Sequence, residues 1–200
     1  MSYAGVSRGR RRFLTGTVTV VGAVGTVFTA VPFVLSWQPS ERARALGAPV
    51  QVDIGKLEPG SRVIVKWQGK PVWIVRRTRD VLEELPAHDG QLRDPSSNES
   101  IQPAYARNEV RALKPEYLVL VGICTHLGCS PQYVRAGQGG QFNLPAGWRG
   151  FFCPCHGSKF DLAGRVYQGV PAPTNLTVPP YRFISDSLVE IGADATQGAA

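Results

Sequence analysis

Hydrophobic positions divide the chain into one long apolar run near the N-terminus and many short apolar runs after it. The long run, residues 13–37, contains 25 residues and no charge. A helix rises about 1.5 Å per residue, so this run can cross a hydrocarbon core of about 30 Å. The pattern therefore predicts a transmembrane anchor at residues 13–37.

The short runs begin at residue 50 and are typical of β-strands separated by turns. Residues 62–67 and 72–77 flank Gln68-Gly69-Lys70 and predict a hairpin, and residues 78–85 predict one short helix. Further strands are expected at residues 117–123, 150–152, 181–185 and 188–191, the last two as a closing hairpin. The head is therefore predicted to be mainly β, with antiparallel strands.

Changes in composition place the domain boundaries. Residues 1–12 precede the anchor, and residues 38–49 are polar and bounded by prolines, which predicts a flexible hinge. One head domain is expected over residues 50–191, in which residues 86–104 are rich in Pro, Ser, Asn and Asp and predict a loop. A disordered tail is expected at residues 192–200.

The formal charge of +7 suggests nucleic-acid binding, but the distribution of charge argues against it. Residues 1–49 contain six arginines and one acidic residue, Glu41, whereas the rest contains sixteen basic and fourteen acidic residues. Basic residues beside an apolar run orient a membrane helix, whereas phosphate binding needs a basic face on the folded domain. The pattern predicts a cytoplasmic N-terminus, an external head and no nucleic-acid partner.

The residues at the start of the apolar run resemble an export signal. Residues 10–14, Arg-Arg-Arg-Phe-Leu, are similar to the twin-arginine signal, which exports proteins already folded in the cytoplasm, often around a cofactor. Residues 43–45, Ala-Arg-Ala, are an alternative, because cleavage after Ala45 would release a soluble protein. A signal core has about 7–15 apolar residues, so the longer run favours an uncleaved anchor.

All four cysteines and two of the three histidines fall in two short loops. Residues 124–129 read Cys-Thr-His-Leu-Gly-Cys, and residues 153–158 read Cys-Pro-Cys-His-Gly-Ser. Six candidate ligands are too many for one tetrahedral metal, whereas four ligands and one disulfide use every residue. A bond between Cys153 and Cys155 would close a strained ring, so a disulfide would most simply join the two loops.

Three plainer interpretations fit these loops less well. A structural zinc site would use Cys-x2–4-Cys or His-x3–5-His spacings, which neither loop has. Two disulfides would leave His126 and His156 unexplained, and a purely structural site for another metal would not explain the paired spacing. The remaining histidine, His88, is interpreted as a surface residue of the polar loop.

The two loops resemble those of the Rieske iron–sulfur protein of bacterial cytochrome bc complexes. In this class of two-iron, two-sulfide cluster, two histidines replace two cysteines on one iron, which raises the reduction potential. The resemblance implies a Rieske-type β domain whose cluster-binding subdomain consists of the two loops. It implies one [2Fe-2S] cluster, with Cys124 and Cys153 on one iron and His126 and His156 on the other.

The resemblance extends to residues around the cluster. It implies a disulfide between Cys129 and Cys155, which suits an external location. It also implies that Ser158 donates a hydroxyl hydrogen bond to a bridging sulfide and so stabilises the extra electron. The apolar cover of the cluster is implied at Leu127, Pro171 and Pro173.

The implied function is electron transfer in a quinol–cytochrome c oxidoreductase. His156 would hydrogen-bond ubiquinol and accept a proton together with the electron, because the charge on the iron and the proton on a ligating imidazole are coupled. The head would then move on its hinge, pass the electron to a c-type cytochrome and release the proton outside, which contributes to proton translocation. The implied partners are the cytochrome b and c-type cytochrome subunits of a dimeric complex in the bacterial inner membrane, with the head in the periplasm.

The main alternative is the small Rieske subunit of an external molybdenum oxidase such as arsenite oxidase, in which the cluster only relays electrons. Cleavage after Ala45 and absence from membranes would favour it. A Rieske ferredoxin of an oxygenase is disfavoured by the anchor and by Cys129 and Cys155. A structural metal module would lack the rhombic spin-resonance signal of a reduced mixed-ligand cluster.

Phe160 departs from the family pattern, because many members carry a tyrosine here whose hydroxyl group reaches a ligand sulfur. Phenylalanine packs the same apolar wall but donates no hydrogen bond. We predict that Phe160→Tyr raises the midpoint potential of the cluster, because a donor to a charged sulfur stabilises the reduced state. A potentiometric titration followed by spin resonance measures the shift, and a change within experimental error would leave Phe160 with a packing role alone.

Overall fold

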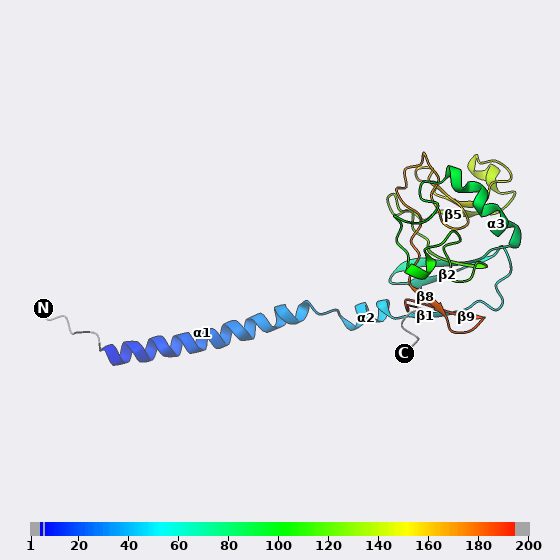
Figure 1. The fold of residues 1–200 in the computed structure, drawn as a ribbon. Coiled ribbons are helices and arrows are strands. Elements are labelled where there is room, and N and C mark those ends of the chain that lie inside the picture. The colour runs from blue at the N-terminus through cyan, green and yellow to red at the C-terminus, as the bar shows by residue number, and fades with distance from the viewer. Residues whose placement is uncertain (1–4, 6, 195–200) are drawn as a thin grey trace. The chain divides into compact units, whose positions relative to one another are not determined.

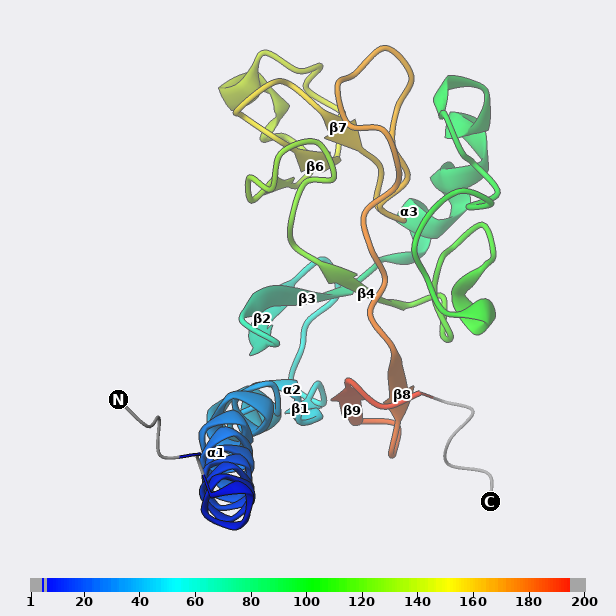
Figure 2. The same cartoon turned by 90° about the vertical axis from the view of Figure 1, so that its left-hand side faces the viewer.

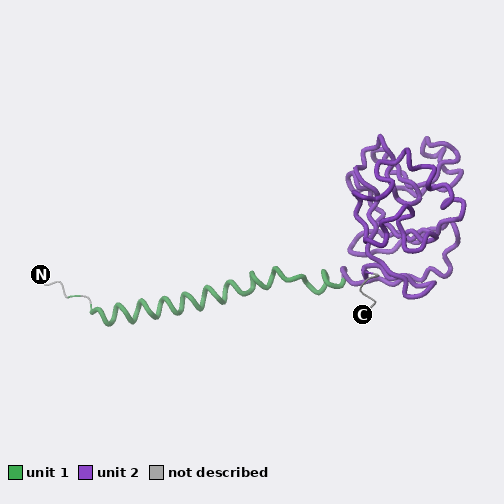
Figure 3. The backbone as a smooth tube through the Cα atoms, in the orientation of Figure 1, with its two compact units in different colours: residues 1–45 green, residues 46–200 purple. Residues whose placement is uncertain are grey.

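The computed structural model describes residue 5 and residues 7–194. These residues divide into two compact units between Ala45 and Leu46 (Figure 3). Residues 1–4 and 6 of the predicted N-terminus, and the predicted tail from residue 195 onward, lie outside the described residues.

Helix α1, Arg8–Ser36, contains 29 residues and covers nearly the whole predicted anchor (Figure 1). Its side chains are exposed, and an 18-residue window of the helical segment has a mean hydropathy of 2.1, which suits a membrane span. Four threonine hydroxyl groups donate to the backbone carbonyl four residues earlier, at 2.8–3.0 Å, namely those of Thr17, Thr19, Thr26 and Thr29. These hydrogen bonds satisfy the hydroxyl groups within the helix, so the threonines are compatible with lipid.

The predicted hinge contains a short helix, α2, Glu41–Gly47. The hydroxyl group of Ser40 accepts a hydrogen bond from the N–H of Ala43 at 3.2 Å, and Arg44 pairs with Glu41 at 2.8 Å. A serine cap followed by residues with high helix propensity explains why this polar segment is not a simple coil. Its flexibility stays a prediction.

The described residues of the second unit, 46–194, form three small antiparallel sheets (Figure 2). In sheet order, their strands are β1 (Val50–Asp53), β9 (Leu188–Ile191) and β8 (Tyr181–Phe183); β2 (Arg62–Trp67), β3 (Lys70–Arg76) and β4 (Tyr117–Val121); β5 (Gln132–Val134), β6 (Gly150–Phe152) and β7 (Lys159–Phe160). Figures 1 and 2 both show the β2–β3–β4 sheet between the other two. The predicted fold class, mainly β with antiparallel strands, is confirmed.

The β2–β3 hairpin follows from its turn residues. Trp67 pairs with Lys70, and between them Gln68 and Gly69 have φ angles of 49° and 74°. A two-residue turn with positive φ at both positions matches the right-handed twist of the strands. Residues 72–75 of β3 are all buried, so this hairpin contributes the centre of the core.

The differences from the predicted elements concern short segments. β4, β6 and the β8–β9 hairpin lie in the predicted ranges, and helix α3 occupies Arg79–Glu84. β1, β5 and β7 have two to four residues each, too few for an alternating pattern to show. Three 3-10 helices complete the chain between strands, and the first two include parts of the predicted loop: η1 (Leu85–Gln91), η2 (Ala104–Ala106) and η3 (Gly139–Phe142).

Three buried arginines hold the turn at residues 161–165, directly after β7. Arg165 and Asp161 form an ion pair of 2.8 Å, with both side chains fully buried. Arg77 and Arg111 donate to backbone carbonyls of this turn at 3.0–3.2 Å. Burial lowers the pKa of Arg77 and of Arg111 to about 10, so both guanidinium groups stay charged at neutral pH. The carbonyl acceptors compensate for part of their lost hydration.

Gly122, directly after β4, packs against the indole ring of Trp73, which is 2% exposed. We predict that Gly122→Ala lowers the free energy of unfolding by about 2–3 kcal/mol, because the added methyl group would overlap a buried ring that packs against Phe151 and Arg62. Gly140→Ala is the matched control, since no atom lies within 4 Å of a Cβ there. Denaturant unfolding of the full chain in detergent measures both variants, and equal stabilities would contradict the prediction.

Candidate metal centre

The two Cys/His loops, residues 124–129 and 153–158, have the same backbone hydrogen bonds. The N–H of the first cysteine donates to the carbonyl of the sixth residue, at 2.7 Å in the first loop and 2.8 Å in the second. The N–H of the fifth residue, a glycine, donates back to the carbonyl of the first cysteine, at 3.1 Å and 2.9 Å. Each loop is therefore a closed turn that presents its side chains from a defined frame.

The glycines at the fifth position, Gly128 and Gly157, allow this frame. Their φ angles are 83° and 75°, in the left-handed region that side chains disfavour. A Cβ would meet no atom within 4 Å at either position. The backbone conformation therefore requires glycine here, and crowding does not.

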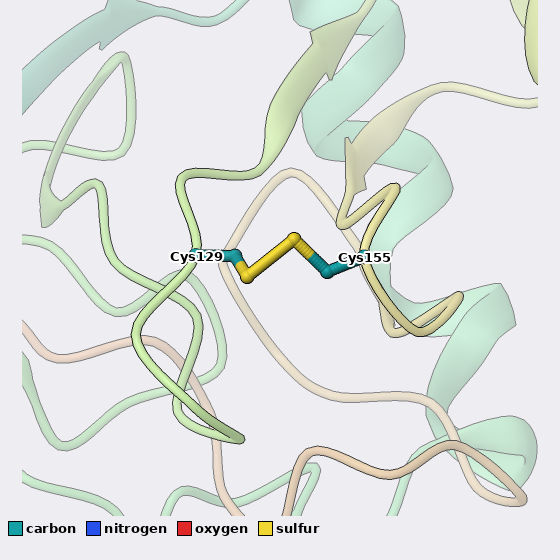
Figure 4. The surroundings of a disulfide bond; sticks show 2 residues. All are labelled: Cys129 and Cys155. Atoms are coloured by element: carbon teal, nitrogen blue, oxygen red, sulfur yellow. A yellow bond between two sulfur atoms is a disulfide. The ribbon is translucent and has the colours of Figure 1, made fainter.

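A disulfide between Cys129 and Cys155 joins the two loops (Figure 4). The two Cα atoms lie 6.8 Å apart. The structure confirms the predicted division of the cysteines, because Cys124 and Cys153 remain as free thiols.

Two thiols and two imidazoles meet beside this disulfide. Cys124 and Cys153 are each 2% exposed. Burial raises the pKa of the Cys124 thiol, and the neighbouring Cys153 thiol contributes to raising it. The backbone N–H of His126, which is hydrogen-bonded to that sulfur, acts in the opposite direction on the pKa but is a smaller effect than burial. The ring centroids of His126 and His156 lie 4.8 Å apart, and the two rings meet edge to face.

The environment of one ring nitrogen indicates that His126 is a metal ligand. Nδ1 of this ring is buried and has no hydrogen-bond partner among the described residues. A buried imidazole nitrogen is costly unless it is hydrogen-bonded or coordinated. Its position next to two buried thiols therefore fits a ligand of a metal centre.

The sulfurs of Cys129, Cys153 and Cys155 also lie within 4.8 Å of one another. Two of these sulfurs are bonded to each other, so the three cysteines are not a ligand set. The proximity shows instead that the disulfide lies directly beside the Cys153 thiol.

Ser158, which the family resemblance implies as a hydrogen-bond donor to the cluster, is the last residue of the second loop. Its side chain is fully buried, and its hydroxyl group acts to lower the pKa of the Cys124 thiol. The same oxygen accepts a hydrogen bond from the N–H of Ala172 at 3.1 Å. Ser158 therefore connects the ligand region to the proline-rich segment, which we define as residues 169–173.

The residues predicted to cover the centre lie at the surface. Leu127 is 71% exposed, and Pro171 and Pro173 are exposed. The hydroxyl group of Thr125 donates to the carbonyl of Thr174 at 2.7 Å, directly after the proline-rich segment. This contact of the first loop was not foreseen from the sequence, because nothing local marks a threonine as the partner of a residue 49 positions away.

His88 is not the surface residue that the sequence suggested. Its side chain is 18% exposed, and Nε2 lies 3.4 Å from Oε1 of Glu84. Helix η1 turns the ring inward, where it lies 5.9 Å from the ring of Tyr167. Phe160 is fully buried and pairs with Phe151 across β6 and β7, which confirms its packing role; its effect on the potential stays a prediction.

Comparison with known proteins identifies the family. Residues 50–181 match the Rieske [2Fe-2S] domain, and residues 1–40 match the twin-arginine signal of the ubiquinol–cytochrome c reductase Fe-S subunit. The chain is 53% identical to the ubiquinol–cytochrome c reductase iron–sulfur subunit of Allochromatium vinosum, over 97% of this chain and 93% of that protein. The chain belongs to this family of Rieske subunits.

Other relatives of this Rieske subunit carry the same name. The protein of Rickettsia felis is 45% identical, over 92% of this chain and 93% of that protein. A solved structure described as a hyperthermophilic respiratory Complex III has 28% identity and a TM-score of 0.45, with 88% of this chain and 98% of that chain covered. The relatives do not favour the molybdenum-oxidase alternative, and the signal match together with α1 fits a membrane-anchored subunit with an exported head.

The residues present fit the [2Fe-2S] cluster of a Rieske subunit. Such a cluster needs two thiolates and two neutral imidazoles, and the two loops bring together that set of donors and no carboxylate. Within the part of the chain that the structure describes, Nδ1 of His126 is buried without a hydrogen-bond partner, and Cys124 and Cys153 form no disulfide, as ligands of a cluster require.

The disulfide generates a prediction about stability. We predict that replacing both Cys129 and Cys155 with serine lowers the free energy of unfolding by about 3–4 kcal/mol, because a cross-link over 26 residues restricts the unfolded chain. Urea unfolding of the full chain in detergent measures the change, with the exposed Ser130→Ala as control. An unchanged unfolding midpoint would show that the hydrogen bonds of the loops hold them without the bridge.

Proposed function

We propose that this chain is the electron-transfer subunit of a quinol–cytochrome c oxidoreductase. The observation that carries the proposal is the pair of cross-linked loops, which gathers two buried free thiols and two imidazoles in a chain of the Rieske family. When bound, the cluster supplies a one-electron carrier, so that the chain accepts an electron from ubiquinol and delivers it to a membrane c-type cytochrome.

Four residues hold the cluster in this proposal. Cys124 and Cys153 bind one iron, and His126 and His156 bind the other, which follows from the family resemblance and from the free thiols and paired rings. Ser158 donates its hydroxyl group toward the centre, and the proline-rich segment limits the access of water.

His156 is the residue that meets the quinol. Its side chain is exposed, whereas that of His126 is half-buried, so His156 is the ring that a substrate can reach. It accepts a hydrogen bond from the quinol hydroxyl group and holds the proton that leaves with the electron. The exposed Leu127 adds an apolar contact beside it for the docking of the head.

The anchor and the export signal define the place of the chain in the cell. Residues 1–12 lie in the cytoplasm, α1 crosses the bacterial inner membrane, and the head at residues 50–191 lies on the periplasmic side, in keeping with the arginines before the apolar run. The partners are the cytochrome b and c-type cytochrome subunits of a dimeric complex. Release of the proton on the periplasmic side contributes to proton translocation.

A spin-resonance experiment tests the assignment of the centre. We expect reduced, washed membranes to give a rhombic signal, and its line shape to change when an inhibitor occupies the quinol site. Alanine substitution at Cys124, His126, Cys153 or His156 should abolish the signal, whereas His88→Ala should keep it.

Two outcomes would contradict the proposal. A line shape that stays the same when the inhibitor is added would favour a cluster that only relays electrons, as in the molybdenum oxidases. A signal that survives the substitution of any of the four ligands would overturn the ligand set.

The hinge at residues 38–49 generates a second prediction. We expect the double variant Gln38→Pro/Glu41→Pro to slow quinol oxidation by several-fold without a change in the spectrum of the cluster, because proline stiffens the segment between the two helices. Glu41 is the first residue of α2, where proline is tolerated, so the helix itself should persist. Steady-state turnover measures the effect against a Gln38→Ala/Glu41→Ala control, and full turnover in the proline variant would refute the hinge.

A further inference from the structure

The proline-rich segment, residues 169–173, cannot hold its own conformation. Pro171 and Pro173 have no N–H, and the segment forms no helix or strand. Such a backbone takes a defined position only when groups from other segments bond its carbonyls and its few N–H groups. Side chains from other parts of the chain must therefore position it beside the two cluster loops.

Arg93 holds the tip of the segment. Its Nη2 donates to the carbonyl of Val170 at 3.2 Å, and its Nη1 donates to the carbonyl of Pro173 at 3.3 Å. One planar guanidinium group therefore joins the two ends of the Val-Pro-Ala-Pro turn. A lysine, with a compact ammonium group, does not offer two donors in this fixed fork.

Asn175 holds the base of the segment. Its side chain is 1% exposed, and its Oδ1 accepts a hydrogen bond from the N–H of Val166 at 2.8 Å, which brings together the chain before and after the proline-rich segment. Its Nδ2 donates to the carbonyl of Asp94 at 2.9 Å and to the hydroxyl group of Ser97 at 3.0 Å. One buried amide thus closes the segment and ties it to a second part of the chain.

This second part, residues 91–100, is itself well fixed. The carboxylate of Asp94 accepts hydrogen bonds from the N–H groups of Asn98 and Glu99 and from the hydroxyl group of Ser100, at 2.7–3.1 Å. Backbone bonds continue the contact, from the N–H of Arg93 to Val166 at 3.0 Å and from the N–H of Gln168 to Gln91 at 2.8 Å. The composition of these residues predicted only a loop, whereas the structure shows a segment that is hydrogen-bonded to the chain on both sides of the proline-rich segment.

We propose that residues 91–100 form a frame that positions the proline-rich segment against the cluster loops, with Arg93 and Asn175 as its positioning residues. The far side of the segment is held by the centre itself, through the bond from Ala172 to Ser158. The proline-rich segment is therefore hydrogen-bonded both to the frame, through Arg93, and to the centre, through Ser158. The inference rests on the proposed function only in so far as the centre binds a cluster at Cys124, His126, Cys153 and His156.

Amide hydrogen exchange of the cluster-loaded full chain in detergent tests the frame. The N–H of Ala172 reports on the segment, because its bond to Ser158 breaks when the segment moves away. We expect Arg93→Gln, Arg93→Lys and Asn175→Ala each to speed exchange at Ala172 by about tenfold, since each removes about the worth of one or two net hydrogen bonds. Cluster loss to a chelator should accelerate in the same variants.

Two matched variants serve as controls. Arg107 and Asn98 are exposed, and their side chains make no hydrogen bond or ion pair within residues 7–194, so Arg107→Gln and Asn98→Ala should leave exchange at Ala172 unchanged. Exchange at Ile74, in the buried core of β3, is measured alongside and should stay slow in every variant that folds.

The results separate the frame from the assignment of the centre. Unchanged exchange at Ala172 in Arg93→Gln or in Asn175→Ala would overturn the proposal, and normal protection in Arg93→Lys would overturn the role of the fork. If ligand substitutions keep the cluster while the frame variants still lose protection at Ala172, the proposed centre fails and the frame stands.

Discussion

The buried ion pair between Asp161 and Arg165 is the interaction on which the head most depends. It fixes the turn between β7, which directly follows the second cluster loop, and Val166, where the chain turns toward the proline-rich segment. Arg77 and Arg111 bind the carbonyls of the same turn from two other parts of the chain. Loss of one partner of such a pair would leave a buried charge uncompensated, at a cost of about 3–5 kcal/mol. The geometry of the centre therefore rests on charges that lie beneath it.

Above this turn, constraint increases toward the centre. Strands lead into each loop, closed turns shape the loops, and the disulfide joins them. Ser158 accepts a hydrogen bond from the N–H of Ala172 in the proline-rich segment, and Thr125 donates one to the carbonyl of Thr174, directly after that segment. A centre that must keep two thiols buried and one imidazole exposed needs this order, because small shifts would exchange their environments.

Several features of the fold and of the centre could be predicted from the sequence, because they depend on residues that are neighbours along the chain. The apolar run, the Gln68-Gly69 turn and the spacing of cysteine and histidine in each loop are local signals, and all three appear in the structure. The bonds from Arg93 to Pro173 and from Asn175 to Asp94 could not be predicted in this way, since they join residues about 80 positions apart. The inward turn of His88 and the helix α2 were missed for a related reason: polar composition was taken to mean an irregular, exposed chain.

The matching frames of the two loops have one further consequence. The histidine is third in the first loop and fourth in the second, although the backbone hydrogen bonds are the same. The fourth position faces solvent in both loops, where it carries Leu127 in one and His156 in the other. A displacement by a single residue within a repeated scaffold thus separates a shielded imidazole from an accessible one. It places an apolar side chain and an exposed imidazole at equivalent positions of the two loops.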